Sequence, residues 1–147
     1  MSPPITCIDD LQALYHRRVP RMFVDYVESG SWSESTLRAN RLAFDGLTFN
    51  QRVAIDLSER SVSAPLLGTD YALPVALAPI GMGGMQRADG EILAARAAEA
   101  IGVPYTLSTM SVCSIEDVAA ATTAPFWFQL YVMRDEGFVR SLIDRAR

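Results

Sequence analysis

The sequence from Val75 onward repeats one arrangement three times: an apolar run that ends in small or polar residues, followed by a segment with helical periodicity. The runs begin at Val75, Pro104 and Phe126, which lie 29 and 22 residues apart. This spacing leaves room for a helix between consecutive strands, as right-handed crossovers between parallel strands require. The apolar character of VALAPI and FWFQLYV indicates strands that are covered on both faces. The pattern therefore predicts an α/β fold with a parallel sheet.

The residues before Val75 follow a different pattern. Helical periodicity and helix-ending residues predict three short helices, at residues 9–17, 20–29 and 34–44. After them, the runs RVAID, SVSAPLLG and YALP are separated by turn-forming Ser, Gly and Asp residues. We expect a strand and hairpin layer there.

These two patterns divide the chain into an N-terminal helical and hairpin segment, residues 1–74, and a barrel segment, residues 75–147. Three parallel strands leave two unpaired edges, and a closed (β/α)8 TIM barrel typically needs about 250 residues. The sequence stops at Arg147, inside an amphipathic helical pattern. We therefore expect an incomplete fold, the first three βα units of a longer barrel, as a truncated product or a fragment.

Composition excludes several classes of protein. Half of the 147 residues are hydrophobic, and 17 acidic against 13 basic residues give a net charge of −4. Without a basic cluster, nucleic-acid binding is not expected. The N-terminus lacks the basic and apolar regions of a signal peptide, and Pro and Gly interrupt the longest uncharged stretch, so we expect a cytoplasmic protein with no transmembrane segment. Cys7 and Cys113 lie far apart without metal-site spacing, which indicates reduced structural thiols and no metal.

Candidate ligand-binding residues follow the three predicted strands, because groups at the carboxyl ends of parallel strands face a common site. Pro79, Ile80 and Gly81 end the first strand, where a glycine lets the backbone approach a flat ligand; the alternative is an ordinary turn. The stretch GMGGMQ that begins at Gly81 resembles a dinucleotide-binding fingerprint only superficially, because Gln86 occupies the third glycine position. A Rossmann fold is therefore not predicted.

Polar residues also end the second and third predicted strands. The Ser108 hydroxyl is placed to serve a ligand or to satisfy the local backbone. Gln129 and Tyr131 alternate on one face of an otherwise apolar strand, so each needs a hydrogen-bond partner if it points into a barrel. A ligand and a buried structural network are both consistent with this pair.

Two residues of the N-terminal segment carry ambiguous signals. Tyr26 shares a predicted helical face with Met22 and Phe23, which by itself favours packing in the core. His16 is the only histidine and lies next to two arginines in a polar helix end. This position favours a solvated side chain over a catalytic base.

Several stretches, in this order along the chain, resemble the N-terminal part of the FMN-dependent 2-hydroxy acid dehydrogenase and oxidase family, which includes glycolate oxidase, L-lactate dehydrogenase and mandelate dehydrogenase. They are VPRMFVDYVESG, SESTLRANRLAF, PVALAPIGMGGM, GE, ARAAEAIGVPYTLST, SIEDVA and FWFQLYVMRD. SWSESTLRAN and LSTMSVCSIEDVA are most similar to the respiratory L-lactate dehydrogenases. The resemblance covers almost the whole chain.

The resemblance implies an eight-stranded β/α barrel with FMN at the carboxyl ends of its strands. By residue-to-residue correspondence, the flavin would contact Pro79, Ile80, Gly81, Ser108 and Gln129. Tyr26 and Tyr131 would bind the substrate through their phenols. The family's catalytic histidine, substrate-binding arginine and flavin-proximal lysine would follow Arg147, so no catalytic base is expected within this chain.

The implied reaction oxidises a small, lactate-like L-2-hydroxy acid to the 2-oxo acid, and quinone, another carrier or oxygen reoxidises the flavin. Met110 stands where glycolate oxidases have a tryptophan and Gly81 where many oxidases have alanine, which favours a dehydrogenase. The resemblance also implies a homo-oligomeric parent enzyme, with association at the inner membrane surface as one possibility. The alternative hypothesis is an inactive fragment or a non-enzymatic remnant that lacks the histidine and the arginine.

Overall fold

The computed structural model describes residues 4–147, so the first three residues of the predicted segment 1–74 lie outside the described residues. The chain forms two compact units, Met1–Arg60 and Ser61–Arg147. The hairpin that was predicted with the N-terminal helices belongs to the second unit. The division at residues 74 and 75 stays a prediction about the sequence pattern.

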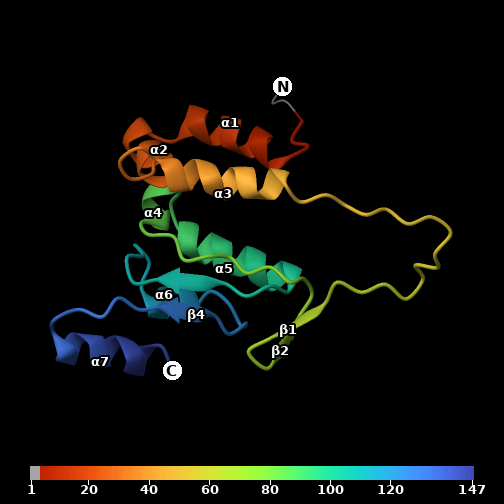
Figure 1. Ribbon diagram of the computed structural model, residues 1–147. Coiled ribbons are helices and arrows are strands. Elements are labelled where there is room, and N and C mark those ends of the chain that lie inside the picture. The colour runs from red at the N-terminus through yellow and green to blue at the C-terminus, as the bar shows by residue number, and fades with distance from the viewer. Residues whose placement is uncertain (1–3) are drawn as a thin grey trace. The chain divides into compact units, whose positions relative to one another are not determined.

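The first unit contains three helices, as predicted: α1 (Ile8–Arg18), α2 (Arg21–Glu28) and α3 (Ser35–Asp45) (Figure 1). The Asp10 carboxylate begins α1 by accepting hydrogen bonds from the backbone of Thr6 at 2.8 Å and of Cys7 at 3.2 Å. Between α3 and Arg60 the described residues form no strand. The expected strand RVAID is therefore absent, and an isolated extended segment without a pairing partner has no ladder to stabilise it.

The second unit begins with an antiparallel hairpin of β1 (Ala64–Leu66) and β2 (Thr69–Tyr71). Its two-residue turn places Leu67 at φ +50° and Gly68 at φ +83°. Positive φ at both positions is the conformation that matches the twist of a tight hairpin. The Tyr71 ring then packs edge-on against Trp127, with ring centroids 6.5 Å apart.

The predicted parallel pairing is present between β3 (Thr106–Ser108) and β4 (Trp127–Gln129). The first predicted strand, VALAPI, is reduced to a single parallel bridge between Leu77 and Tyr105. Leu77 N–H donates to the carbonyl of Pro104 at 2.9 Å, and Thr106 N–H donates to the carbonyl of Leu77 at 3.1 Å. The prolines at both ends of this run have no N–H to extend the ladder, which explains its shortness.

Four helices accompany these strands: α4 (Gly83–Gln86), α5 (Gly90–Ile101), α6 (Ile115–Ala119) and α7 (Glu136–Arg145) (Figure 1). The single turn α4 was not predicted. Ser114 caps α6, because its hydroxyl accepts a hydrogen bond from Asp117 N–H at 3.0 Å. Asp89, which precedes α5, makes no side-chain cap and adopts a left-handed conformation with φ +56°.

The core of the second unit lies between α5, β3, α6 and α7. Leu107 at the centre of β3 and Val118 of α6 are both 0% exposed. Small residues on α5, Ala95 and Ala98, allow the helix to pack closely against the strands, and Leu142 of α7 completes the cluster. This packing holds β3 and β4 with their carboxyl ends on the same side. The described residues form two two-stranded sheets and do not close a barrel.

Candidate functional site

Hydrogen bonds join the three strand ends within the second unit. Met82 N–H, after the first run, donates to the carbonyl of Met110 after β3 at 2.8 Å. Thr109 N–H donates to the carbonyl of Gln129 at the end of β4 at 3.0 Å. Tyr131 N–H in turn donates to the Thr109 hydroxyl at 3.0 Å. The three segments that carry the predicted ligand-binding residues therefore lie next to one another.

Ser108 and Gln129 form the polar centre of this region. Ser108 is 4% exposed, and its hydroxyl donates to Oε1 of Gln129 at 3.3 Å while accepting from Met110 N–H at 3.1 Å. The same Oε1 also accepts from Thr109 N–H at 3.3 Å. The carbonyl end of the Gln129 side chain is thus held by the protein. Its amide nitrogen makes no hydrogen bond to any described residue and keeps its two N–H groups for a ligand acceptor.

The end of the first run offers an apolar surface. Ile80 is 56% exposed and Pro79 is also exposed, whereas Gly81 is half-buried. An exposed isoleucine beside a glycine gives a flat ligand both an apolar contact and close access to the backbone.

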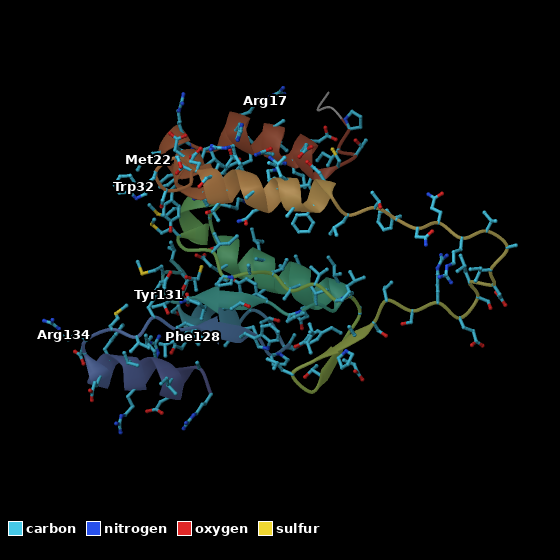
Figure 2. The ribbon with its side chains drawn as sticks, in the orientation of Figure 1. Arg17, Met22, Trp32, Phe128, Tyr131 and Arg134 are labelled. Carbon is cyan, nitrogen blue, oxygen red and sulfur yellow. The ribbon has the colours of Figure 1, made fainter. Side chains whose placement is uncertain are left out.

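Tyr131 comes two residues after the end of β4, and Figure 2 labels its side chain together with that of Phe128 of β4. The tyrosine is 53% exposed, and its backbone is fixed by the bond to Thr109, so its phenol is accessible while its position is held. A buried structural network does not account for this phenol. The hydrogen bonds of a structural network are instead made by the buried Ser108 hydroxyl and the half-buried Gln129 side chain.

Tyr26 belongs to α2 of the first unit and is 49% exposed. The helical face that Tyr26 shares with Met22 and Phe23 favoured packing in a core. A side chain that is half exposed does not fit that interpretation. His16 is not simply solvated: its Nε2 lies 2.8 Å from each carboxylate oxygen of Glu28, which links α1 to α2. Gln12 donates to the same carboxylate, and these bonds hold the pKa of Glu28 below its usual value.

Sequence reasoning missed one buried acid in the region. Glu91 of α5 is 2% exposed. It accepts one backbone hydrogen bond from the loop after the VALAPI run and one from the loop after β3. The only local signal was its place in the GE motif after Asp89, at the start of the predicted helix. Burial and the nearby Glu91 charge also raise the pKa of the Tyr105 phenol to about 12.

Comparison with known proteins identifies the family. The chain matches the FMN-dependent dehydrogenase family over residues 15–147. The chain therefore belongs to the FMN-dependent dehydrogenases. This confirms the resemblance drawn from the motifs, and the cofactor that the family implies is FMN.

Relatives and solved structures agree with this assignment. The chain is 45% identical over 143 residues to an L-lactate dehydrogenase of Stenotrophomonas maltophilia (strain R551-3), covering 97% of this chain and 38% of the relative. It is 46% identical over 142 residues to an L-lactate dehydrogenase of Caulobacter vibrioides (strain NA1000 / CB15N), covering 97% of this chain and 37% of the relative. The chain thus spans well under half the length of these curated relatives.

The structure is similar to two 2-hydroxy acid enzymes of known structure. A monotopic membrane protein, (S)-mandelate dehydrogenase, superposes with a TM-score of 0.91 at 34% identity, covering 98% of this chain and 38% of that one. Mandelate oxidase superposes with a TM-score of 0.90 at 35% identity, covering 97% of this chain and 41% of that one. The mixed α/β chain therefore matches part of the fold of these enzymes.

Within residues 4–147, no helix combines the length and the apolar composition that crossing a bilayer requires.

Proposed function

We propose that the protein carrying this chain oxidises a small L-2-hydroxy acid, with L-lactate as the first candidate, to the corresponding 2-oxo acid. The observation that carries this proposal is the hydrogen-bonded cluster of strand ends around Gln129 in a member of an FMN-dependent family. Lactate is the first candidate because L-lactate dehydrogenases are 45% identical to the chain.

The residues at the strand ends fit a flavin. The Gln129 amide group has its oxygen held by Ser108 and Thr109, so its nitrogen is set to donate to a carbonyl of the ring. Pro79 and Ile80 offer apolar contact, and Gly81 brings backbone close to the ring. Ser108 contributes by orienting Gln129, and a direct contact between its hydroxyl and the flavin is part of the proposal.

Substrate binding is assigned to the phenols of Tyr131 and Tyr26. Each is about half exposed, at 53% and 49%. A phenol donates a hydrogen bond to a carboxylate or to the oxygen being oxidised, and bonds to charged acceptors are the stronger ones. In this proposal each phenol would hold the acid so that its α-hydrogen faces the electron acceptor.

The reaction removes the α-hydrogen with its electron pair and the hydroxyl proton, leaving the C=O of the 2-oxo acid. Bound FMN supplies the acceptor for the electron pair. His16, the only histidine in the chain, is engaged with Glu28 in the first unit, and we do not assign it as the base. The family's histidine, arginine and lysine are expected in sequence after Arg147, on later strand ends.

Partners and location complete the proposal. The electrons pass to a quinone, another carrier or oxygen, and the parent enzyme is proposed to be a homo-oligomer. A cytoplasmic enzyme, peripheral to the inner membrane, is consistent with the similarity to a monotopic membrane protein. Nucleic acid is not a proposed partner, given the net charge of −4.

The test is a flavin titration followed by anaerobic reduction. The purified protein carrying this chain should bind FMN stoichiometrically, and L-lactate should bleach its oxidised-flavin absorbance, whereas D-lactate should not. Sequence downstream of Arg147 should contain a histidine and an arginine at a later strand end. Failure to bind FMN would refute the proposal and favour the alternative, an inactive remnant. Bound flavin that no L-2-hydroxy acid reduces would refute the enzymatic part alone.

A further inference from the structure

Glu91 is the most deeply buried carboxylate among the described residues, and the proposed reaction does not use it. It is the second residue of α5, at the helix end that adjoins the carboxyl ends of the strands, and is 2% exposed. Its Oε1 accepts hydrogen bonds from the N–H groups of Gly84 and Val112, each at 2.9 Å. One oxygen therefore binds two backbone segments that are far apart in sequence.

One of the two bound segments follows the VALAPI run, and the other follows β3. Gly84 comes three residues after Gly81, and Val112 comes four residues after Ser108. A direct bond between Met82 N–H and the Met110 carbonyl, at 2.8 Å, runs beside the carboxylate link. Glu91 thus ties together the loops that begin with the proposed flavin contacts.

The pKa of the Glu91 carboxyl is lowered, which favours the ionised form of its side chain. Burial raises its pKa, but the backbone N–H groups of Val112, Gly84 and Glu91 itself more than compensate, so the net pKa lies below the ordinary value. The first turn of a helix also favours negative charge. Hydrogen bonds to an ionised acceptor are stronger than neutral ones, so the link between the loops is a strong one.

The glycines of GMGGMQ explain how the loops reach this carboxylate. A Cβ added to Gly84 would lie 2.7 Å from the Val112 Cβ and 3.0 Å from Oε2 of Glu91. A Cβ on Gly90 would lie 2.5 Å from the carbonyl oxygen of Gly83. Oε2 itself is buried without a hydrogen-bond partner among residues 4–147. The GMGGMQ stretch, which does not match a dinucleotide-binding fingerprint, therefore packs around the Glu91 side chain.

We propose that Glu91 is a positioning residue. By binding the loop after the VALAPI run and the loop after β3, it sets the separation of the two strand ends that carry Gly81 and Ser108. The inference rests on the proposed FMN site. It assigns to Glu91 no contact with the flavin or the substrate. It also predicts that a neutral side chain with the same oxygen keeps part of the link, because Oε1 alone makes both bonds.

Glu99 provides a matched control on the same helix. Its carboxylate accepts from the Thr122 hydroxyl at 2.7 Å, from Thr123 N–H at 3.1 Å and from the Thr123 hydroxyl. These residues precede β4, at the end opposite to Gln129. Removing Glu99 should therefore destabilise the fold without disturbing the strand ends that carry the proposed site.

The experiment measures FMN dissociation constants and urea unfolding midpoints for the protein carrying this chain and for Glu91→Ala, Glu91→Gln and Glu99→Ala. Glu91→Ala should weaken FMN binding about tenfold or more, while Glu91→Gln should recover part of the loss. Glu99→Ala should lower the midpoint yet keep FMN affinity within about twofold of the wild type.

Three outcomes would overturn the inference. The first is that Glu91→Ala and Glu99→Ala lower the urea midpoint equally and also weaken FMN binding equally. The others are an unchanged FMN affinity in Glu91→Ala, and a loss of FMN affinity in Glu91→Gln as large as in Glu91→Ala. If Glu91→Ala does not fold, Gly84→Ala replaces it. That variant keeps the carboxylate but pushes Val112 away, and normal FMN affinity in it would refute the inference. Wild-type protein that binds no FMN would instead show that the proposed function itself fails.

Discussion

The Ser108 hydroxyl donates a hydrogen bond to Oε1 of Gln129 at 3.3 Å, so two residues at the ends of neighbouring parallel strands share one polar contact. Ser108 is 4% exposed, and its main effect in this arrangement is on the orientation of the Gln129 amide. A ligand acceptor placed over the strand ends would then meet the amide nitrogen and not the oxygen.

The first prediction concerns this pair. Ser108→Ala should weaken FMN binding by about fivefold, the equivalent of one hydrogen bond of about 1 kcal/mol, because the Gln129 amide is then less restrained. Gln129→Ala should weaken it more, and Ser108→Ala should cause a smaller loss in the Gln129→Ala background than in the wild type, because part of its effect acts through the Gln129 amide. Flavin titration of the two single variants and the double variant measures this coupling. Strictly additive losses would mean that Ser108 binds the flavin independently.

The second prediction separates substrate binding from flavin binding. Tyr131→Phe should lower kcat/KM for the 2-hydroxy acid about ten- to hundredfold, because a hydrogen bond to a charged group contributes about 1.5–3 kcal/mol. Flavin content should stay near that of the wild type, since the exposed phenol is not needed to hold Gln129. Tyr26→Phe serves as the parallel variant. Loss of flavin with unchanged turnover of the remaining holoenzyme would contradict the role given to Tyr131.

The third prediction concerns acid stability. Arg145 binds both carboxylate oxygens of Glu116 at 2.6 and 2.7 Å, which links α7 to α6 and lowers the pKa of Glu116 from 4.5 to about 2. Because the folded-state pKa is the lower one, the pair stabilises the fold above pH 4.5, and this contribution is lost as the pH falls towards about 2. Glu116→Gln should therefore lose less stability than the wild type across this window.

Urea unfolding midpoints measured at several pH values between neutral and acid test this prediction. Both partners are substantially exposed, so the difference at neutral pH should be small. A steeper acid loss in Glu116→Gln than in the wild type would have the wrong sign for this linkage.

The fourth prediction concerns the core that supports the strand ends. Leu107 is 0% exposed at the centre of β3, so Leu107→Ala should lower the free energy of unfolding by about 2–5 kcal/mol through lost burial and a residual cavity. The exposed Leu93 of α5 is the matched control, and Leu93→Ala should cost much less. Equal losses in the two variants would mean that β3 does not lie at the centre of the packing.

The elements that sequence analysis placed correctly depend on local patterns. The helices α1, α2 and α3 follow from apolar spacing, and the β1–β2 hairpin follows from its turn-forming sequence. The parallel pairing of β3 with β4 follows from the strand-to-strand spacing, because only a crossover helix fits between them. In each case the deciding residues lie within one element or between consecutive ones.

Two strand expectations were wrong, and one residue departs from what its type suggests. RVAID has strand-like composition, but no neighbouring backbone pairs with it. Asp89 has the residue type of a helix cap, yet it takes a left-handed conformation and makes no side-chain cap. VALAPI pairs only at Leu77, because Pro74 and Pro79 have no N–H group to donate to a longer ladder.

The sequence by itself determined the family, the three N-terminal helices, the parallel pairing of β3 with β4 and the residues expected at the strand ends, since these depend on patterns and motifs read along the chain. Only the tertiary structure decided that Gln129 has its oxygen held by Ser108 and that Glu91 is buried between two loops. The partners of Glu91 lie 7 and 21 residues away. Whether such a carboxylate is solvated or buried depends on which backbone N–H groups the fold brings to it, and no local pattern contains that information.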